Sequence, residues 1–169
     1  MVDSPRARYL MNQLIPTVEN QLANVEGFGT LLRKLKNEPW RGSRKEAAIF
    51  HAERALEYHR EGKLVAIERY ERINDRRVFY DLVINESIEA IGEFREVIVE
   101  LKNWGGWYRW MLATKQIRLA KLIAQMAVYS QSGRFIRLEF KHFIPDMVAD
   151  SRALRSLVYH GKIEIRAIL

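Results

Sequence analysis

Two acidic residues and one lysine occupy apolar segments at positions that suit chemistry. Asp81 lies within "YDLVI", and Glu100 and Lys102 close the segment "VIVELK". Side chains alternate along a strand, so Glu100 and Lys102 share one face and Leu101 is the spacer between them. Charged side chains are rarely buried unless they are paired or take part in chemistry. The sequence therefore predicts that these charges form a site.

The chemistry that these residue types support is metal-assisted attack of water on a phosphodiester. Two neighbouring carboxylates repel each other, and a hard cation such as Mg²⁺ (or Mn²⁺) would bind both through oxygen. Lys102 beside such an ion would orient or help deprotonate a water and stabilise charge developing on a phosphate. A plain ion pair at the mouth of the sheet is the alternative.

A mixed sheet flanked by helices must position these residues. The segment 95–102 is apolar on both faces, which indicates a central strand, and a hairpin with 77–84 would place Asp81 beside Glu100. A capping box of Ser43 and Glu46 opens the first core helix, and Asn74-Asp75 suits a turn. In chain order the sequence predicts a helix over 44–60, strands over 63–71, 77–84 and 95–102, a helix over about 110–131, a strand over 134–142, a helix over 147–160 and a last strand over 162–169.

Residues 1–42 read as a helical N-terminal extension to a domain over residues 43–169. Ser4-Pro5 predicts the start of a first helix, and Pro16 predicts an interruption of it. Gly27 and Gly29 predict a turn before "TLLRKLKN", and "EPWRGS" predicts a loop after it. The expected fold is α/β, with an α-β-β-β-α-β core over about 44–142.

Composition narrows the class of protein. The 169 residues contain no cysteine, which excludes disulfides and thiolate-held metal centres. No apolar run approaches the roughly 20 residues of a membrane span, and no signal peptide opens the chain, so we expect a cytoplasmic protein as given. A net charge of +7 and a pI near 9.8 favour polyanionic partners.

The order of elements, with Asp81 on one strand and Glu-x-Lys on the next, resembles the PD-(D/E)XK nuclease superfamily, which has the restriction-endonuclease-like fold. "YDLVI" and "VIVELKNW", with 18 residues between Asp81 and Glu100, carry the likeness, although Tyr80 stands where the family motif has proline. The resemblance implies that Asp81 and Glu100 bind metal together with the Leu101 carbonyl, and that Lys102 is the catalytic lysine.

Three further residues extend the resemblance. The family often has a glutamate on the first core helix; Glu46 is the best match and Glu53 the second, although Glu46 equally fits the capping box. "QMAVY" places Gln125 and Tyr129 one turn apart, similar to the Gln-x-x-x-Tyr element of RecB-type members. That element implies that Gln125 supports the site and Tyr129 binds nucleic acid. An ordinary amphipathic helix would give the same pattern.

Aromatic and basic residues follow Lys102 closely. Trp104 and Trp107, in a three-residue spacing continued by Trp110, would either pack a turn against the core or stack with unpaired bases. On the long helix, Arg118 and Lys121 would contact phosphates or form a solvated face.

A second Glu-x-Lys, at Glu139 and Lys141 in "LEFKH", is rejected as the site. Its strand alternates, which predicts Ile136, Leu138 and Phe140 inward and the charged residues outward in solvent. The four histidines show no metal-ligand spacing, and His51 and His59 fit a helix surface.

The leading hypothesis is a Mg²⁺-dependent nuclease, with DNA favoured as substrate and RNA open. Its role would be repair, restriction or the toxic end of a larger secreted protein. A toxin would be delivered into another cell and would have an acidic inhibitor or immunity protein as partner. Many relatives are dimers, so a homodimer stays open. The alternative is a non-catalytic nucleic-acid-binding or assembly module on the same fold.

Overall fold

Apolar segments between residues 64 and 168 form five strands of one mixed sheet. The computed structural model describes residues 4–88 and 90–169. The strands lie side by side in chain order: β1 (Leu64–Ile73), β2 (Arg76–Ile88), β3 (Glu93–Lys102), β4 (Phe135–Lys141) and β5 (Ile163–Ile168). β1, β2 and β3 pair antiparallel, whereas β3, β4 and β5 pair parallel. The expected α/β class with a mixed sheet is confirmed.

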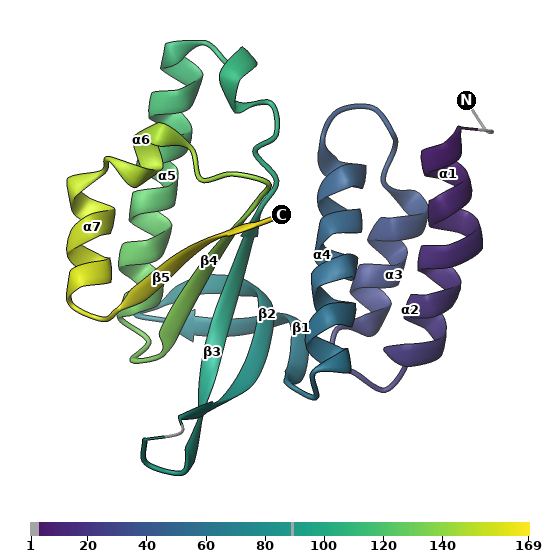
Figure 1. Ribbon diagram of the computed structural model, residues 1–169, viewed down its shortest axis with the longest axis horizontal. Helices are drawn as coiled ribbons and strands as arrows, with labels where there is room; N and C mark the ends of the chain where they lie inside the picture. The colour runs from purple at the N-terminus through teal and green to yellow at the C-terminus, as the bar shows by residue number, and fades with distance from the viewer. Residues whose placement is uncertain (1–3, 89) are drawn as a thin grey trace.

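Helices cover both faces of the sheet (Figure 1). One face carries α1 (Pro5–Tyr9), the π-helical turn η1 (Leu10–Leu14), α2 (Ile15–Gln21), α3 (Phe28–Asn37) and α4 (Arg44–Arg60). The other carries the 3₁₀ turn η2 (Trp107–Arg109), α5 (Leu112–Ser130), α6 (Asp146–Ala149) and α7 (Arg152–Tyr159). In the described part of the chain, no helix is both long and apolar enough to span a membrane.

The core consists of two apolar layers, one on each side of the sheet. Val97, Val99 and Leu101 of β3 face the layer formed with α4 and the N-terminal helices. Ile98, between them, faces the layer formed with α5. Because side chains alternate, Glu100 and Lys102 belong to the α5 side. The predicted central position of β3 is confirmed, since both of its faces are buried.

The N-terminal helices are joined to this core rather than set apart from it. Helical backbone runs on from Pro5 to Gln21, so the interruption expected at Pro16 does not occur. The π-helical turn before Pro16 gives the proline ring the space that a regular helix lacks. α3 then packs near β1, where the Ile67 N–H donates to the Glu26 carbonyl at 2.8 Å.

Gly27 fits where the chain passes closest to β1. Its φ is +87°, and a Cβ placed on it would lie 1.7 Å from the Ile67 carbonyl oxygen. Only glycine accepts both the left-handed conformation and this contact. The packing is therefore continuous between residues 4–37 and the sheet.

Near the C-terminus, the single helix expected over 147–160 is two helices. The chain turns at Asp150 and Ser151, and the Ser151 hydroxyl accepts a hydrogen bond from the Leu154 N–H at 3.3 Å. A serine before a helical segment caps a new helix more readily than it continues an old one.

The charged face of β4 is buried, which contradicts the expected exposure of Arg137 and Glu139. Arg137 is 1% and Glu139 0% exposed. The strand alternates as predicted, but α4 covers its polar face and supplies partners. Glu139 accepts bonds from Arg54 at 2.9 and 3.1 Å and from the Tyr58 hydroxyl at 2.6 Å. Both faces of β4 are therefore buried: the apolar residues pack in one core layer, and the charged residues bond to α4 on the other side.

Glu139→Gln is expected to lower the free energy of unfolding by about 3 kcal/mol, because it leaves the guanidinium of Arg54 buried without its carboxylate. Urea unfolding measures the loss. Glu57→Gln, an exposed change on α4, should stay within about 0.5 kcal/mol of wild type. Mg²⁺ affinity of the folded Glu139→Gln protein should not change; a lost Mg²⁺ response would mean that the second Glu-x-Lys has been wrongly rejected.

Candidate active site

The hairpin of β2 and β3 brings the two predicted acids face to face. Leu82 pairs with Val99 and Val83 with Ile98. The same register, continued by one residue, sets Asp81 opposite Glu100. Ladder pairing of the two strands ends at Leu82 and Val99, so the acids lie where the strands begin to separate.

The carboxylate of Asp81 occupies this gap between the strands. Its Oδ2 accepts a hydrogen bond from the Leu101 N–H at 2.8 Å. The N–H and C=O of one strand residue point toward the same neighbouring strand, so the Leu101 carbonyl faces the same gap. Asp81 thus satisfies a backbone donor that the separated ladder leaves free, and its side chain is 18% exposed.

Glu100 is a buried acid with an incomplete set of partners. It is 4% exposed, and its Oε1 accepts a bond from Gln125 Nε2 at 2.9 Å. Its Oε2 is buried and has no hydrogen-bond partner among the described residues. Burial and the adjacent Asp81 carboxylate raise the pKa of Glu100 well above its usual range, and Lys102 only partly offsets them.

Lys102 and α5 complete the cluster. The Lys102 Nζ lies 3.5 Å from Glu100 Oε1, as their shared strand face predicted. Gln125 Nε2 also lies 3.0 Å from the Tyr129 hydroxyl, which in turn donates to the Phe79 carbonyl at 3.0 Å. The structure therefore brings Asp81, Glu100, Lys102 and Gln125 together.

Tyr129 lies on the inner face of α5. Its side chain is 4% exposed, and its contact with nucleic acid stays a prediction. Its hydroxyl holds the Gln125 amide against α5 and ties the helix to β2. The Gln-x-x-x-Tyr spacing predicted two residues on one helix face, and the face turns out to be the inner one.

The donor set fits a small, hard cation. The two carboxylates are neighbours, strand geometry turns the Leu101 carbonyl toward the same gap, and Glu100 Oε2 has no hydrogen-bond partner among the described residues. Within the described residues no group of three His, Cys, Asp or Glu side chains is placed to hold a metal. Mg²⁺ commonly takes one or two protein carboxylates and retains several waters, which matches this set.

The α4 glutamates are not part of this cluster. Glu46 accepts bonds from Arg6 at 2.7 to 3.2 Å instead, and the Ser43 side chain makes no capping bond, so the expected capping box is not formed. Arg6 holds the pKa of the Glu46 carboxyl below its usual range.

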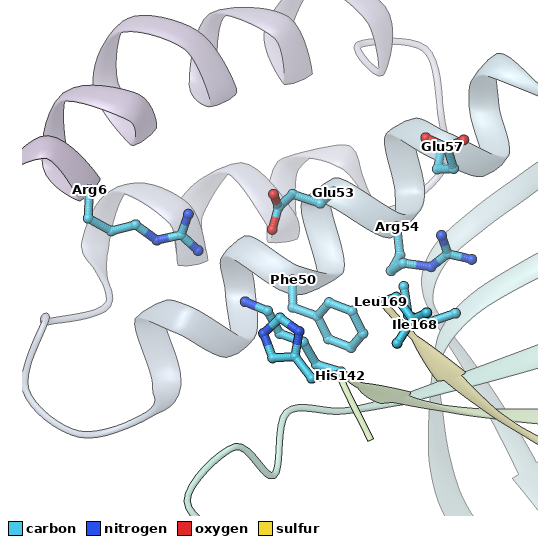
Figure 2. Close-up of a pocket in the computed structure, with 9 residues that line it drawn as sticks. Arg6, Phe50, Glu53, Arg54, Glu57, His142, Ile168 and Leu169 are labelled. Atoms are coloured by element: carbon cyan, nitrogen blue, oxygen red, sulfur yellow. The ribbon is translucent and has the colours of Figure 1, made fainter. Parts of the chain in front are cut away.

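Glu53, the second choice, lines a different cavity. This cavity measures about 290 Å³ and is bounded by α1, α4 and the ends of β4 and β5 (Figure 2). Figure 2 shows Glu53 near Arg6 and Arg54, and neither Asp81 nor Glu100 lines the space. The helix glutamate implied by the resemblance therefore has no counterpart beside the two acids.

His51 is the α4 residue that does approach the site. Its Nε2 lies 3.9 Å from Asp81 Oδ2, and its side chain is 17% exposed. The sequence predicts a place for it on the helix surface, because one histidine without metal-ligand spacing carries little information. Knowing which face of α4 meets the separated end of β2 would have identified it.

The tryptophans form a packed wall beyond Lys102. Trp104 and Trp107 stack with ring centroids 5.6 Å apart and an interplanar angle of 4°. Trp107 is fully buried and donates from Nε1 to Asp146 at 3.0 Å, which fits the alternative of packing against the core. Trp104 is 8% exposed and lines a cavity.

That cavity adjoins the acid cluster and measures about 310 Å³. Its lining residues are Lys102, Trp104, Arg118, Lys121, Leu122 and Gln125. Arg118 and Lys121, predicted to contact phosphates, therefore lie on the same opening as Lys102 and Gln125.

No protein-family model, curated protein or solved structure matches this chain. The interpretation of the site therefore depends on its own residues and geometry.

Proposed function

We propose that this protein is a divalent-metal-dependent nuclease that hydrolyses phosphodiester bonds of nucleic acid, with DNA favoured. One observation carries the proposal: two facing carboxylates, one of them buried with an unpaired oxygen, lie beside a lysine. A structural ion pair between Glu100 and Lys102 would account for one acid and would leave the second carboxylate, that of Asp81, unexplained.

Each residue of the cluster has a role in this proposal. Asp81, Glu100 and the Leu101 carbonyl would hold Mg²⁺ or Mn²⁺, which when bound supplies Lewis-acid polarisation of a phosphate and a more acidic water. Lys102 orients the attacking water and donates to the phosphate oxygens as the bond from phosphorus to the leaving oxygen breaks. Gln125 fixes the Glu100 carboxylate through its 2.9 Å hydrogen bond.

The arrangement of elements supports the restriction-endonuclease-like assignment. α4, β1, β2, β3, α5 and β4 follow the α-β-β-β-α-β order, with Asp81 on the second strand and Glu100 and Lys102 on the third. Toxin, repair and restriction roles all remain consistent with this chemistry, as do an acidic inhibitor and a homodimer.

A substrate panel tests the catalytic proposal. Supercoiled plasmid, linear duplex, single-stranded DNA and transfer RNA are incubated with the protein in Mg²⁺, Mn²⁺ or EDTA. We expect metal-dependent cleavage of at least one substrate, reduced about a thousandfold in Asp81→Asn. Asp75→Asn, a matched change in the exposed β1–β2 turn, should cleave like wild type. Equal cleavage by wild type and Asp81→Asn would refute the proposal.

A non-catalytic nucleic-acid-binding module is the second candidate, favoured because no group of three His, Cys, Asp or Glu side chains among the described residues is placed to hold a metal. Calorimetric titration with Mg²⁺ and Mn²⁺ distinguishes the two. Heat of binding in wild type that is lost in Asp81→Asn supports the nuclease, whereas no binding in either protein supports the module.

A further inference from the structure

The cavity beside Lys102 is basic on its rim and apolar on its wall. Lys102, Arg118 and Lys121 supply three cations, and none of its lining residues is acidic. Among the described residues, no ion pair joins Arg118 or Lys121 to an acid, whereas Lys102 pairs with Glu100 at 3.5 Å. Two cations without an acidic partner, beside a third that is paired, attract an anion with more than one negative oxygen, such as a phosphate.

The wall of the cavity is built for a flat apolar group. Trp104 and Leu122 line it, and both are otherwise buried, at 8% and 1% exposure. Trp104 is held in place by stacking on Trp107 and by edge contacts with Trp110 and Phe140. A tryptophan fixed in this way offers its exposed part as a rigid contact for a nucleobase, with little loss of side-chain freedom on binding.

Arg118 is also positioned before any ligand arrives. Its guanidinium lies 4.2 Å from the centroid of the Trp110 ring, a stacking contact that orients the side chain at the cavity rim. A preorganised guanidinium binds phosphate with less loss of side-chain freedom than a mobile one.

We infer that this cavity binds one unpaired nucleotide next to the hydrolysed bond, and that the protein therefore acts on single-stranded or unpaired nucleic acid. The inference rests on the proposed nuclease function for its location. A cavity of about 310 Å³ accommodates one nucleotide, with its base against Trp104 and its phosphate at the cations. A paired base would first have to leave its stack, so a duplex pays an energetic penalty that a single strand does not.

Binding without metal tests the inference separately from catalysis. Fluorescence anisotropy in EDTA compares labelled 12-nucleotide thymidine and uridine strands with a 12-base-pair duplex. We expect a single strand to bind about tenfold more tightly than the duplex. Whichever strand binds more tightly, DNA or RNA, identifies the substrate class. Tighter binding of either strand than of the duplex supports the inference. Duplex binding as tight as that of both strands would overturn it.

A pair of charge-reversal variants locates the site. Arg118→Glu with Lys121→Glu should weaken single-strand binding at least about tenfold and lower the salt dependence. The control is Arg33→Glu with Lys36→Glu on α3, which changes the same residue types at the same spacing on an exposed face across the sheet. The control should lose less than about threefold. Equal losses in the two double variants would overturn the inference.

Tryptophan emission reports contact with the wall. Binding of a single strand should quench the fluorescence of wild type, and Trp104→Phe should lose most of that quenching and weaken binding by about threefold or more. Unchanged quenching in Trp104→Phe would place the base elsewhere.

If the glutamate variants unfold, Arg118→Gln with Lys121→Gln repeats the comparison of charge variants. Single-strand binding without any cleavage would refute the nuclease while leaving the cavity assignment standing; cleavage of duplex and single strand at equal rates would do the reverse.

Discussion

Glu100→Gln is expected to abolish metal-dependent hydrolysis and, in the absence of metal, to make the folded protein more stable than wild type. The loss of activity should reach about a thousandfold or more, because one of the two carboxylates proposed to bind metal becomes neutral. The gain in the free energy of unfolding should be about 1 kcal/mol or more at neutral pH.

The physical reason for the gain is the position of Glu100. Its carboxyl is buried beside Asp81, and its Oε2 has no partner among the described residues. A glutamine oxygen would still accept the bond from Gln125, and its amide group would donate toward the Asp81 carboxylate. The substitution therefore removes a repulsion and satisfies an unpaired atom. Activity and stability are expected to change in opposite directions, as at other strained functional sites.

The same feature sets a pH dependence. Glu100 has an ordinary pKa near 4.5 in the unfolded chain and a raised pKa in the folded protein. The folded protein thus binds this proton more tightly, so the associated stability is fully present below pH 4.5 and is lost as pH rises through the folded pKa. Metal-free wild type should lose stability over that range relative to Glu100→Gln, measured by urea unfolding at a series of pH values in EDTA.

Glu93→Gln is the matched control for both experiments, since it makes the same chemical change at an exposed position of β3. It should retain full activity and the wild-type pH profile. Two results would contradict the interpretation: Glu100→Gln less stable than wild type at neutral pH without metal, or Glu100→Gln with normal hydrolysis.

Gly27→Ala should be the most destabilising small substitution in the N-terminal segment, with a loss of about 3 kcal/mol or more. The added methyl group would have to sit 1.7 Å from the Ile67 carbonyl oxygen, on a residue whose φ is +87°. Relief requires moving α3 away from β1 and breaking the bond from Ile67 N–H to Glu26 O. Thermal or urea unfolding measures the effect.

Gly29→Ala, two residues further on, provides a control of opposite sign. A Cβ at Gly29 meets nothing within 4 Å, and the residue lies in the first turn of α3. Alanine favours helix over glycine by up to about 1 kcal/mol, so this variant should be unchanged or slightly more stable. Similar stabilities for the two alanine variants would mean that the loop at Gly27 moves aside freely.

The sequence was most informative where local rules act alone. Alternation along β3 correctly placed Glu100 and Lys102 on one face, and the apolar residues on both faces of the segment identified a central strand. The hairpin then set Asp81 opposite Glu100. These features depend on neighbours in the chain, which the sequence displays directly.

Errors and open alternatives arose where packing between distant segments decides the outcome. Glu139 is buried because α4 brings Arg54 and Tyr58 to it, 85 and 81 residues away in the chain. Glu46 turns to Arg6 for the same kind of reason, and Trp107 and Tyr129 are buried although their spacing equally suited an exposed face. His51 was missed because its neighbour, Asp81, lies on another element.

The pairing of β2 with β3 also bears on how such a site is inherited. Asp81 and Glu100 meet because of their place in the ladder, and beyond them the strands continue to Ile88 and Glu93. Equal lengthening or shortening of both strands at that far end would change the number of residues between the acids without moving either one. A shift of one residue in the pairing register of β2 and β3 would move every side chain of one strand to the opposite face of the sheet and destroy the site. Descendants of one ancestor could therefore keep the facing acids while their sequence separation drifts, so shared ladder position is a better sign of kinship than fixed spacing.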